Sequence, residues 1–308
     1  GGVYLSYDRG VNWLHLNNIP AGEFYAVSVD DADPYRIYGG TQDNAAHVGP
    51  ADRLPEDGID DAWRYVWIDL WGGGDSYVTL VDPTDPDVIY FEQQFGGLQR
   101  KDMGTGEIVR IQPQADEEAG EEELRYNWMS PFIVSHHNPL TVYFGANRLF
   151  KSLNRGDDWR PVSPDLSTQP GPERQGNVPF GTITTISESP LRPGLLYVGT
   201  DDGRVWVTGN DGVDWTPLGG ALPDLWVSRV EASAHEEGTV YVTLTGYRED
   251  DFRAYAYRSD DQGATWTSIA EGLPDQQLNV IREDPADSAR IYVGSDQGGV
   301  YVSANRGE

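Results

Sequence analysis

The chain has 308 residues, no cysteine and a net charge of −28, since 50 acidic residues stand against only 22 lysines and arginines. The absence of cysteine excludes disulfides, thiolate chemistry and cysteine metal sites, and the acidic excess disfavours binding to nucleic acid or to anionic membranes. No apolar run approaches the roughly 18–20 residues of a membrane helix, and no signal peptide is recognisable.

Short segments rich in aromatic and β-branched residues recur along the chain at intervals of about 40–55 residues, and such segments are typical of strands. Repeats at this interval indicate a propeller or a solenoid. The six most similar copies are 36–41, 88–92, 141–145, 195–200, 239–243 and 290–295.

Each copy follows another short strand and a tight turn rich in Asp and Pro, as in 25–29 before Asp30 and 77–81 before Asp82. A third strand comes next, then a turn and a fourth strand, and no amphipathic helix is evident. Four strands per period predict the blade of a β-propeller. We therefore expect a single all-β propeller domain of about six four-stranded blades, at approximately 23–70, 76–114, 127–166, 181–223, 226–274 and 277–308, the last completed by 1–18.

The turn between the third and fourth strands has the pattern Ser/Thr-x-Asp/Asn-x-Gly-x-x-Trp. In such a turn the Asp or Asn side chain bonds nearby backbone, and glycine adopts a positive φ at no steric cost. We expect the Trp to pack back under its own turn as an anchor. These segments, called the repeat turns below, are 6–13, 152–159, 208–215 and 259–266, with a shorter copy at 303–307.

The repeat turns resemble the Asp-box, or bacterial neuraminidase repeat, of sialidases, xyloglucanases, sortilin-type receptors and many bacterial proteins labelled glycosyl hydrolase. The resemblance covers essentially the whole chain. In that family the motif is structural and lies away from the active face, which implies a structural role for the Asp and Trp residues. Sialidases of the family also carry an Arg-Ile-Pro signature, whereas this chain has Asn18-Ile19-Pro20, so sialidase activity is not expected.

The two ends of the chain share one pattern, since residues 1–6 match 298–303. The last blade lacks its fourth strand, and residues 11–16 could supply it, closing the ring with strands from both termini and removing exposed sheet edges. A longer propeller, of which this chain is a part, would equally explain why the third strand is present twice.

Ligands of propellers usually bind at the channel mouth, on the loops between second and third strands and between blades. Glycoside hydrolysis needs two carboxyl groups, roughly 5–5.5 Å apart for retention or 6.5–9.5 Å apart for inversion. The catalytic candidates on this rim are Asp43, Asp75 and Glu92, with Asp201 as a further carboxylate. The residues expected to contact a ligand are Gln42, Asn44, Trp71, Tyr77, Tyr126, Trp128, Arg148, Asp201, Asp202 and Arg248.

Three functions fit this rim. The first is a binding module for a glycan or a protein partner. The alternative is a glycoside hydrolase of the xyloglucanase-like type, which needs paired carboxyl groups, one with a raised pKa. A truncated or engineered propeller scaffold without activity is the third. Fold alone does not decide among them, because propellers carry many unrelated functions.

No cofactor is expected, although turns such as Asp82/Asp85 could bind calcium through oxygen ligands. The adjacent His136 and His137 point to opposite faces of an extended segment, so we interpret them as a turn variant and not as metal ligands. The chain has only two lysines, Lys101 and Lys151. This shortage, together with the acidity, is typical of halophilic proteins. We expect an extracellular or cell-envelope location, with the cytoplasm of a halophile as the alternative, and no membrane insertion.

Overall fold

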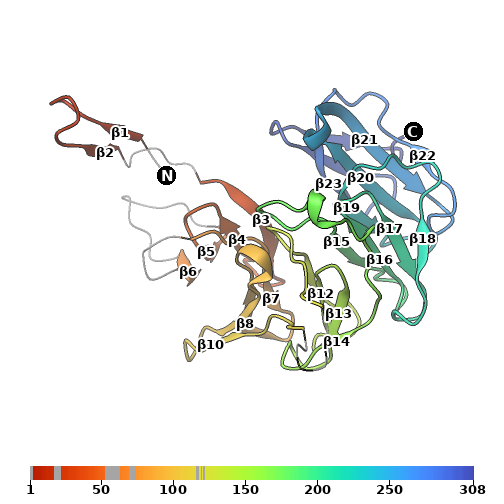
Figure 1. Cartoon of the computed structure of the whole chain (residues 1–308), viewed down its shortest axis with the longest axis horizontal. Helices are drawn as coiled ribbons and strands as arrows, with labels where there is room; N and C mark the ends of the chain where they lie inside the picture. The colour runs from red at the N-terminus through yellow and green to blue at the C-terminus, as the bar shows by residue number, and fades with distance from the viewer. Residues whose placement is uncertain are drawn as a thin grey trace. The chain divides into compact units, whose positions relative to one another are not determined.

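The computed structural model describes residues 3–16, 22–52, 63–68, 74–115, 118, 120 and 122–308 (Figure 1). Across these ranges the regular structure consists of strands and three short 3₁₀ turns, and no helix is long and apolar enough to span a membrane. The strands form antiparallel blades, five with four strands and one with three among the described residues, besides a two-stranded hairpin. The predicted all-β propeller class is confirmed.

The first of two compact units comprises residues 1–93 and 98–109. It contains the hairpin β1–β2 and two blades, β3–β6 and β7–β10. Its strands are β1 (Val3–Leu5), β2 (Leu14–Leu16), β3 (Phe24–Val29), β4 (Arg36–Thr41), β5 (Ala46–Pro50), β6 (Arg64–Trp67), β7 (Thr79–Asp82), β8 (Asp85–Phe91), β9 (Gln99–Asp102) and β10 (Ile108–Arg110).

The second unit comprises residues 94–97 and 110–308 and contains the remaining four blades. Its strands are β11 (Phe132–Val134), β12 (Val142–Gly145), β13 (Leu149–Ser152), β14 (Arg160–Pro161), β15 (Ile183–Glu188), β16 (Leu196–Thr200), β17 (Val205–Thr208), β18 (Thr216–Leu218), β19 (Trp226–Ala232), β20 (Val240–Gly246), β21 (Asp251–Ser259), β22 (Thr267–Ser268), β23 (Leu278–Glu283), β24 (Ile291–Ser295) and β25 (Val300–Ser303). The 3₁₀ turns are η1 (Gln94–Gly96), η2 (Pro172–Arg174) and η3 (Tyr247–Glu249).

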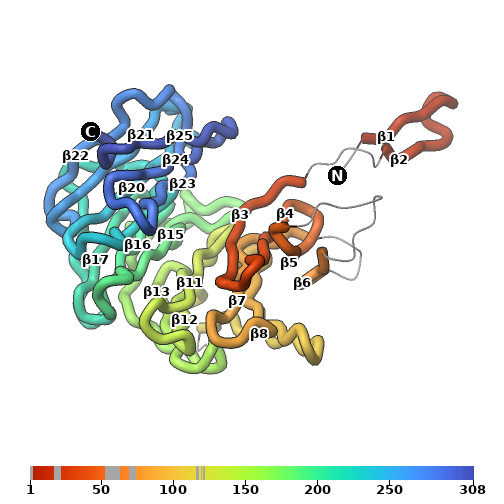
Figure 2. Tube along the Cα trace, turned by 180° about the vertical axis from the view of Figure 1, so that it is seen from behind, coloured from red at the N-terminus to blue at the C-terminus, as the bar shows by residue number. Residues whose placement is uncertain are grey.

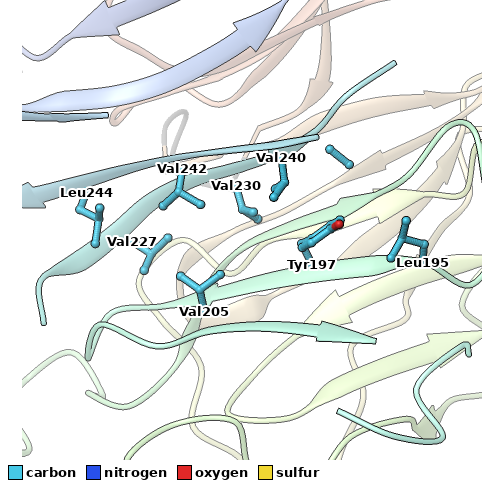
Figure 3. Packing of buried hydrophobic residues seen from close by; sticks show 9 residues of the cluster. Leu195, Tyr197, Val205, Val227, Val230, Val240, Val242 and Leu244 are labelled. Atoms are coloured by element: carbon cyan, nitrogen blue, oxygen red, sulfur yellow. The ribbon is translucent and has the colours of Figure 1, made fainter. Parts of the chain in front are cut away.

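Apolar side chains of facing blades form the core of the second unit. Along β20, Val240, Val242 and Leu244 lie on one face, as the two-residue period of a strand requires, and all three are fully buried. They pack against residues of β16, β17 and β19 (Figure 3). The buried pair Val227 and Val230 on β19 breaks this period because the register shifts between them.

A tyrosine in the second strand fixes the turn that precedes it. Tyr38 donates from its hydroxyl to Asp30 Oδ2 at 3.0 Å, and Tyr292 donates to Asp284 Oδ2 at 2.9 Å. In both blades the partner lies eight residues earlier, so the Asp-rich turn and the aromatic strand form one local unit. The aspartates predicted to form these turns therefore have a specific hydrogen-bond partner, the tyrosine of the strand that follows.

Other blades place serine at this turn and use a carboxylate of the next blade. Ser135 Oγ donates to Glu188 Oε1 at 3.0 Å, and the backbone N–H of His136 donates to Glu188 Oε2 at 2.8 Å. The Nε2 atom of His137 lies 2.8 Å from the carbonyl oxygen of Ser189. The two histidines thus belong to a turn that links neighbouring blades.

The five repeat turns share one conformation. Each has a residue with φ between 57° and 62° followed by a glycine with φ between 85° and 91°. In each, the glycine N–H donates to the first Ser or Thr hydroxyl, as Gly212 does to Thr208 Oγ1 at 3.0 Å. In the four longer copies the Asp or Asn side chain accepts a backbone N–H four residues later, as in Asp214 to Asn210 Oδ1 at 2.9 Å. This is the predicted self-contained turn.

Candidate functional site

In the first unit, Asp75 is a buried carboxylate that holds the loop after β4. Its Oδ1 accepts the backbone N–H of Asp43 at 2.7 Å, and its Oδ2 accepts the hydroxyls of Tyr25 and Tyr77, each at 3.3 Å. Asp43 itself has a φ of 57° and an exposed side chain. Asp75 therefore fixes the backbone of Asp43, while the Asp43 carboxylate faces solvent.

Glu92 is fully buried beside this pair. Its carbonyl oxygen accepts the N–H of Tyr77 at 3.1 Å and the hydroxyl of Ser76 at 2.8 Å. Burial raises the pKa of Tyr77, and the negative charges of Asp75 and Glu92 raise it further. The three catalytic candidates thus lie in one neighbourhood, although only Asp43 presents its carboxylate to solvent.

The other first-unit candidates differ in exposure. Gln42 and Asn44 are exposed, and the Asn44 side chain donates to the carbonyl oxygen of Gln42 at 2.8 Å. Tyr77 is fully buried, with its ring 4.6 Å from that of Tyr25, so it supports the loop from below. Trp71 lies outside the described residues.

In the second unit, Asp201 lies at the centre of a buried network. Its Oδ1 accepts the N–H groups of Gly181 and Thr182 at 2.9 and 2.8 Å. Its Oδ2 accepts the Thr182 hydroxyl at 2.8 Å and the Asn127 amide at 3.2 Å. Asp201 is only 4% exposed, and this burial raises its pKa to about 6 against the opposing effect of the bonds from Thr182.

The neighbouring Asp202 holds a different part of the rim. Its Oδ2 accepts both the backbone N–H and the hydroxyl of Thr168, at 2.6 and 2.8 Å. Thr168 lies in the long segment 162–182 between β14 and β15, and Gly181 and Thr182, which bond Asp201, lie at its end. Asp201 and Asp202 therefore hold two points of that segment, at its end and at Thr168.

A third carboxylate, Asp165, is paired with a cation. Arg125 Nη2 donates to its Oδ2 at 2.6 Å, and the Asn147 amide donates to the same oxygen at 2.9 Å. Burial would raise the pKa of Asp165, but bonds from Ser167, Asn147 and Arg125 outweigh burial and lower it. At neutral pH Asp165 is therefore ionised, whereas Asp201, with its raised pKa, is protonated in part of the molecules.

An aromatic pair lies on the same loops. The rings of Phe95 and Trp128 meet edge to face, with centroids 5.1 Å apart. The backbone N–H of Phe95 donates to the Trp128 carbonyl at 3.2 Å, and Gln112 Nε2 donates to the Phe95 carbonyl at 3.0 Å. Phe95 has a left-handed backbone (φ 58°, ψ 43°) and its side chain remains 39% exposed. A phenylalanine held in this conformation by neighbouring groups stores strain of the kind found at binding sites.

Two more rings carry a stacked arginine. The guanidinium of Arg248 lies 4.6 Å from the ring centre of Trp226, and that of Arg174 lies 4.6 Å from the ring centre of Phe180. Such stacking orients the guanidinium and leaves its N–H groups available for hydroxyl or carbonyl oxygens. Arg148 is half-buried, and its Nε has no hydrogen-bond partner among the described residues.

The predicted ligand residues thus divide into two groups. Trp128, Arg148, Asp202 and Arg248 reach the surface, whereas Tyr126 is buried and donates its hydroxyl to the carbonyl oxygen of Pro113 at 2.6 Å. The sequence analysis did not name Phe95, Phe180 or Trp226 among the residues expected to contact a ligand. Only the Gln-Phe-Gly sequence at Phe95, a loop immediately after a strand, offered a signal.

Metal binding has little support among the described residues, where no group of three or more His, Asp or Glu side chains could hold an ion. The acidic turns have protein partners instead. Asp82 Oδ1 accepts the N–H and the hydroxyl of Thr84 at 2.9 and 2.7 Å, and Asp30 pairs with Arg36 at 2.6 Å.

Comparison with known proteins found the similar proteins given below. No protein-family model matches the chain. A xyloglucanase from a Paenibacillus species is 25% identical over 319 residues, which covers 90% of this chain and 30% of that protein. The crystal structure of an ancestral GH74 enzyme aligns with a TM-score of 0.63 and 14% identity, covering 91% of this chain and 36% of that one. A GH74 xyloglucanase from Xanthomonas campestris aligns with 92% of this chain and 52% of its own length, at a TM-score of 0.49 and 17% identity.

This chain therefore spans about a third of the length of the Paenibacillus relative. The alignment with the ancestral GH74 enzyme, at a TM-score of 0.63, bears on the fold alone.

Proposed function

We propose that this chain is the glycan-binding part of a glycoside hydrolase of the xyloglucanase type. The match of 90% of the chain to a xyloglucanase carries the proposal. It favours the hydrolase alternative over a free-standing binding module, which was the first interpretation of the sequence. The substrate class would be a β-linked glucan chain with xylose branches.

The rim of the second unit supports glycan binding. Sugar rings present apolar C–H faces that pack on aromatic rings, and the half-exposed pair Phe95 and Trp128 offers such a platform. Arg248 and Arg174, held over their own rings, supply donors to sugar hydroxyls. A site of this kind combines flat apolar surface with a few oriented polar groups.

For the chemistry we assign Asp43 as the candidate carboxylate that contacts substrate, because its side chain is exposed and its backbone is held by Asp75. Asp75 is then a positioning residue. Asp201, with a pKa of about 6, has the protonation behaviour of a general acid, but its four hydrogen bonds and its burial favour a supporting role.

The test measures binding and turnover together. The 308-residue chain is titrated with xyloglucan and with unbranched β-glucan by affinity electrophoresis, and reducing ends are assayed in parallel. We expect Phe95→Ala to weaken xyloglucan binding roughly 3- to 10-fold, the range of an aromatic contact. The control is Tyr35→Ala, which removes an aromatic ring that is also exposed but lies in a turn before β4, away from the rim loops.

Release of reducing ends that Asp43→Asn abolishes and Tyr35→Ala preserves would support catalysis on this chain. Binding without turnover would support the glycan-binding role of this chain and would contradict the assignment of Asp43 as a catalytic carboxylate. Absence of binding to every glucan, at both low and molar salt, would refute the proposal.

A further inference from the structure

The first strands of three successive blades, β15, β19 and β23, share one register. Each is the edge strand of its sheet, and each has a register shift near its start, directly before Thr185, Arg229 and Val280 respectively. These three residues are therefore equivalent, and in the same way Val230 on β19 corresponds to Ile281 on β23. The last two of these blades are neighbours, and Figure 2 shows β20 and β23 side by side.

The free edge of β19 presents backbone N–H groups that the preceding blade satisfies. The N–H of Val230 donates to Thr185 Oγ1 at 3.2 Å, and that of Ala232 donates to Ser187 Oγ at 2.9 Å. Both acceptors are hydroxyls on β15. Such N–H groups point away from the partner strand because the bonds of an antiparallel pair alternate along the strand, and each needs an acceptor from elsewhere.

The free edge of β23 meets a different side chain. The N–H of Asp284 donates to the carbonyl oxygen of Arg290 on the other side of the turn, at 3.0 Å, so by the same alternation the N–H of Ile281 points away from β24. The residue equivalent to Thr185 is now Arg229, whose guanidinium has five N–H donors and no acceptor. The hydroxyl that serves β19 is therefore replaced on β23 by a group that only donates.

Arg229 is a partly buried cation whose charge is poorly compensated. Its Nε is buried and has no hydrogen-bond partner in the described part of the chain. Burial, together with the charge of Arg282, lowers the pKa of Arg229 to about 10. Glu231 also acts on Arg229, but its carboxylate already pairs with Arg282. Glu283 lies on the opposite face of β23, where it accepts the Ser233 hydroxyl at 2.7 Å. Two guanidinium groups thus share one carboxylate.

We propose that a small monovalent anion binds between Arg229 and the free edge of β23. The anion accepts hydrogen bonds from the guanidinium and from the N–H of Ile281, and so supplies the acceptor that Thr185 provides to the preceding blade. A single negative charge balances the one excess guanidinium. Polyanions are disfavoured, because the net charge of −28 repels them. Chloride is the probe, and formate tests whether a carboxylate can take its place.

Thermal unfolding at constant ionic strength separates anion binding from screening. Chloride replaces the bulkier gluconate at a fixed total of about 0.5 M sodium salt. We expect the melting temperature of the original chain to rise by about 2 °C or more, since a ligand that binds only the folded state stabilises it. Arg229→Met retains an apolar chain of similar length without the charge, and should not respond to chloride.

The matched control is Arg192→Gln, because it removes a guanidinium that has its own partner, Glu237, at 2.9 Å. This variant should respond to chloride as the original chain does. In a separate measurement, the broadening of the chloride NMR signal by the protein should fall about fivefold or more in Arg229→Met and remain in Arg192→Gln. Glu231→Gln frees the charge of Arg282, and should tighten chloride binding about threefold or more.

Equal melting temperatures of the original chain in chloride, formate and gluconate would overturn the proposal. So would a chloride response that Arg229→Met retains, or chloride binding that Glu231→Gln leaves unchanged. Similar responses to chloride and formate would support a site for any small anion. A response to formate alone would support the site with a carboxylate as its occupant. Xyloglucan binding is measured separately on the rim, so failure of the anion site leaves the proposed function untouched.

Discussion

At the scale of single residues, Asp201 combines two opposing effects. Four donors stabilise its ionised form, while burial at 4% exposure disfavours the charge more strongly, so its pKa rises from 3.8 to about 6. The folded protein therefore binds a proton at this carboxyl more readily than the unfolded chain does. This contribution to stability is complete below about pH 4 and is lost as pH rises through 6.

The higher pKa of Asp201 in the folded protein than in the unfolded chain predicts how Asp201→Asn changes the pH dependence of stability. The amide cannot ionise, yet its oxygen can still accept the N–H groups of Gly181 and Thr182. The free energy of unfolding of the original chain, relative to the variant, should fall by on the order of 3 kcal/mol between pH 4 and pH 7. Urea unfolding of both proteins at several pH values measures this. If the difference in the free energy of unfolding between the two proteins does not change with pH, the raised pKa of Asp201 is contradicted.

At the scale of elements, the repeat turn forms from local bonds, but its tryptophan depends on the neighbouring blade. Trp159 donates to the carbonyl oxygen of Ile111 at 2.6 Å and Trp215 to that of Val162 at 2.9 Å, both outside their own blades. Only Trp13, on the exposed hairpin, bonds the turn that carries it. The sequence did not predict that a neighbouring blade would supply the acceptor for Trp159 and Trp215.

Matched substitutions distinguish the indole of Trp215, which bonds a neighbouring blade, from the exposed indole of Trp13. Trp215→Phe leaves the partly buried Val162 carbonyl without its donor, and should lower the free energy of unfolding by about 1–3 kcal/mol. Trp13→Phe removes an exposed indole and should change it by less than about 0.5 kcal/mol. Urea midpoints at an unchanged denaturant slope give both values. Equal losses for the two variants would show that the indole acts within the turn alone.

At the scale of the whole molecule, charge is the dominant feature. With 50 acidic and 22 basic side chains, most carboxylates have no cation to pair with. Some ion pairs do form near strand ends. Arg258, near the end of β21, pairs with Asp260 at 2.9 Å. The remaining like charges repel one another across the surface, which opposes the folded state.

Salt should therefore stabilise this chain. Raising NaCl from about 0.05 to 1 M shortens the screening length from over 10 Å to about 3 Å, and we expect the melting temperature to rise by roughly 5 °C or more. Sucrose at equal osmolality is the control, because it does not screen charge. If sucrose gives the same increase, exclusion of solute from the surface, and not screening, is the cause. The proposed halophilic adaptation requires the NaCl effect.

How far the sequence predicts this molecule depends on the distance over which a bond acts along the chain. The segment 36–41 was predicted as a strand and is β4. The bond from Asp214 to Asn210 spans four residues, so residue type and spacing suffice to predict it. The rim could be predicted only as a set of loops, since the bond from Asp43 to Asp75 spans 32 residues and that from Asn127 to Asp201 spans 74.

The sequence by itself thus determined the all-β propeller class, the strand order within the blades and the conformation of the repeat turns, because alternating apolar residues and short-range hydrogen bonds act within a few residues. Only the tertiary structure decided which rim carboxylates are buried, which aromatic rings stay exposed and which blade supplies the acceptors of Trp159 and Trp215. These properties arise when residues from different blades pack together and exclude water, as in the bonds from Trp159 to Ile111 and from Trp215 to Val162.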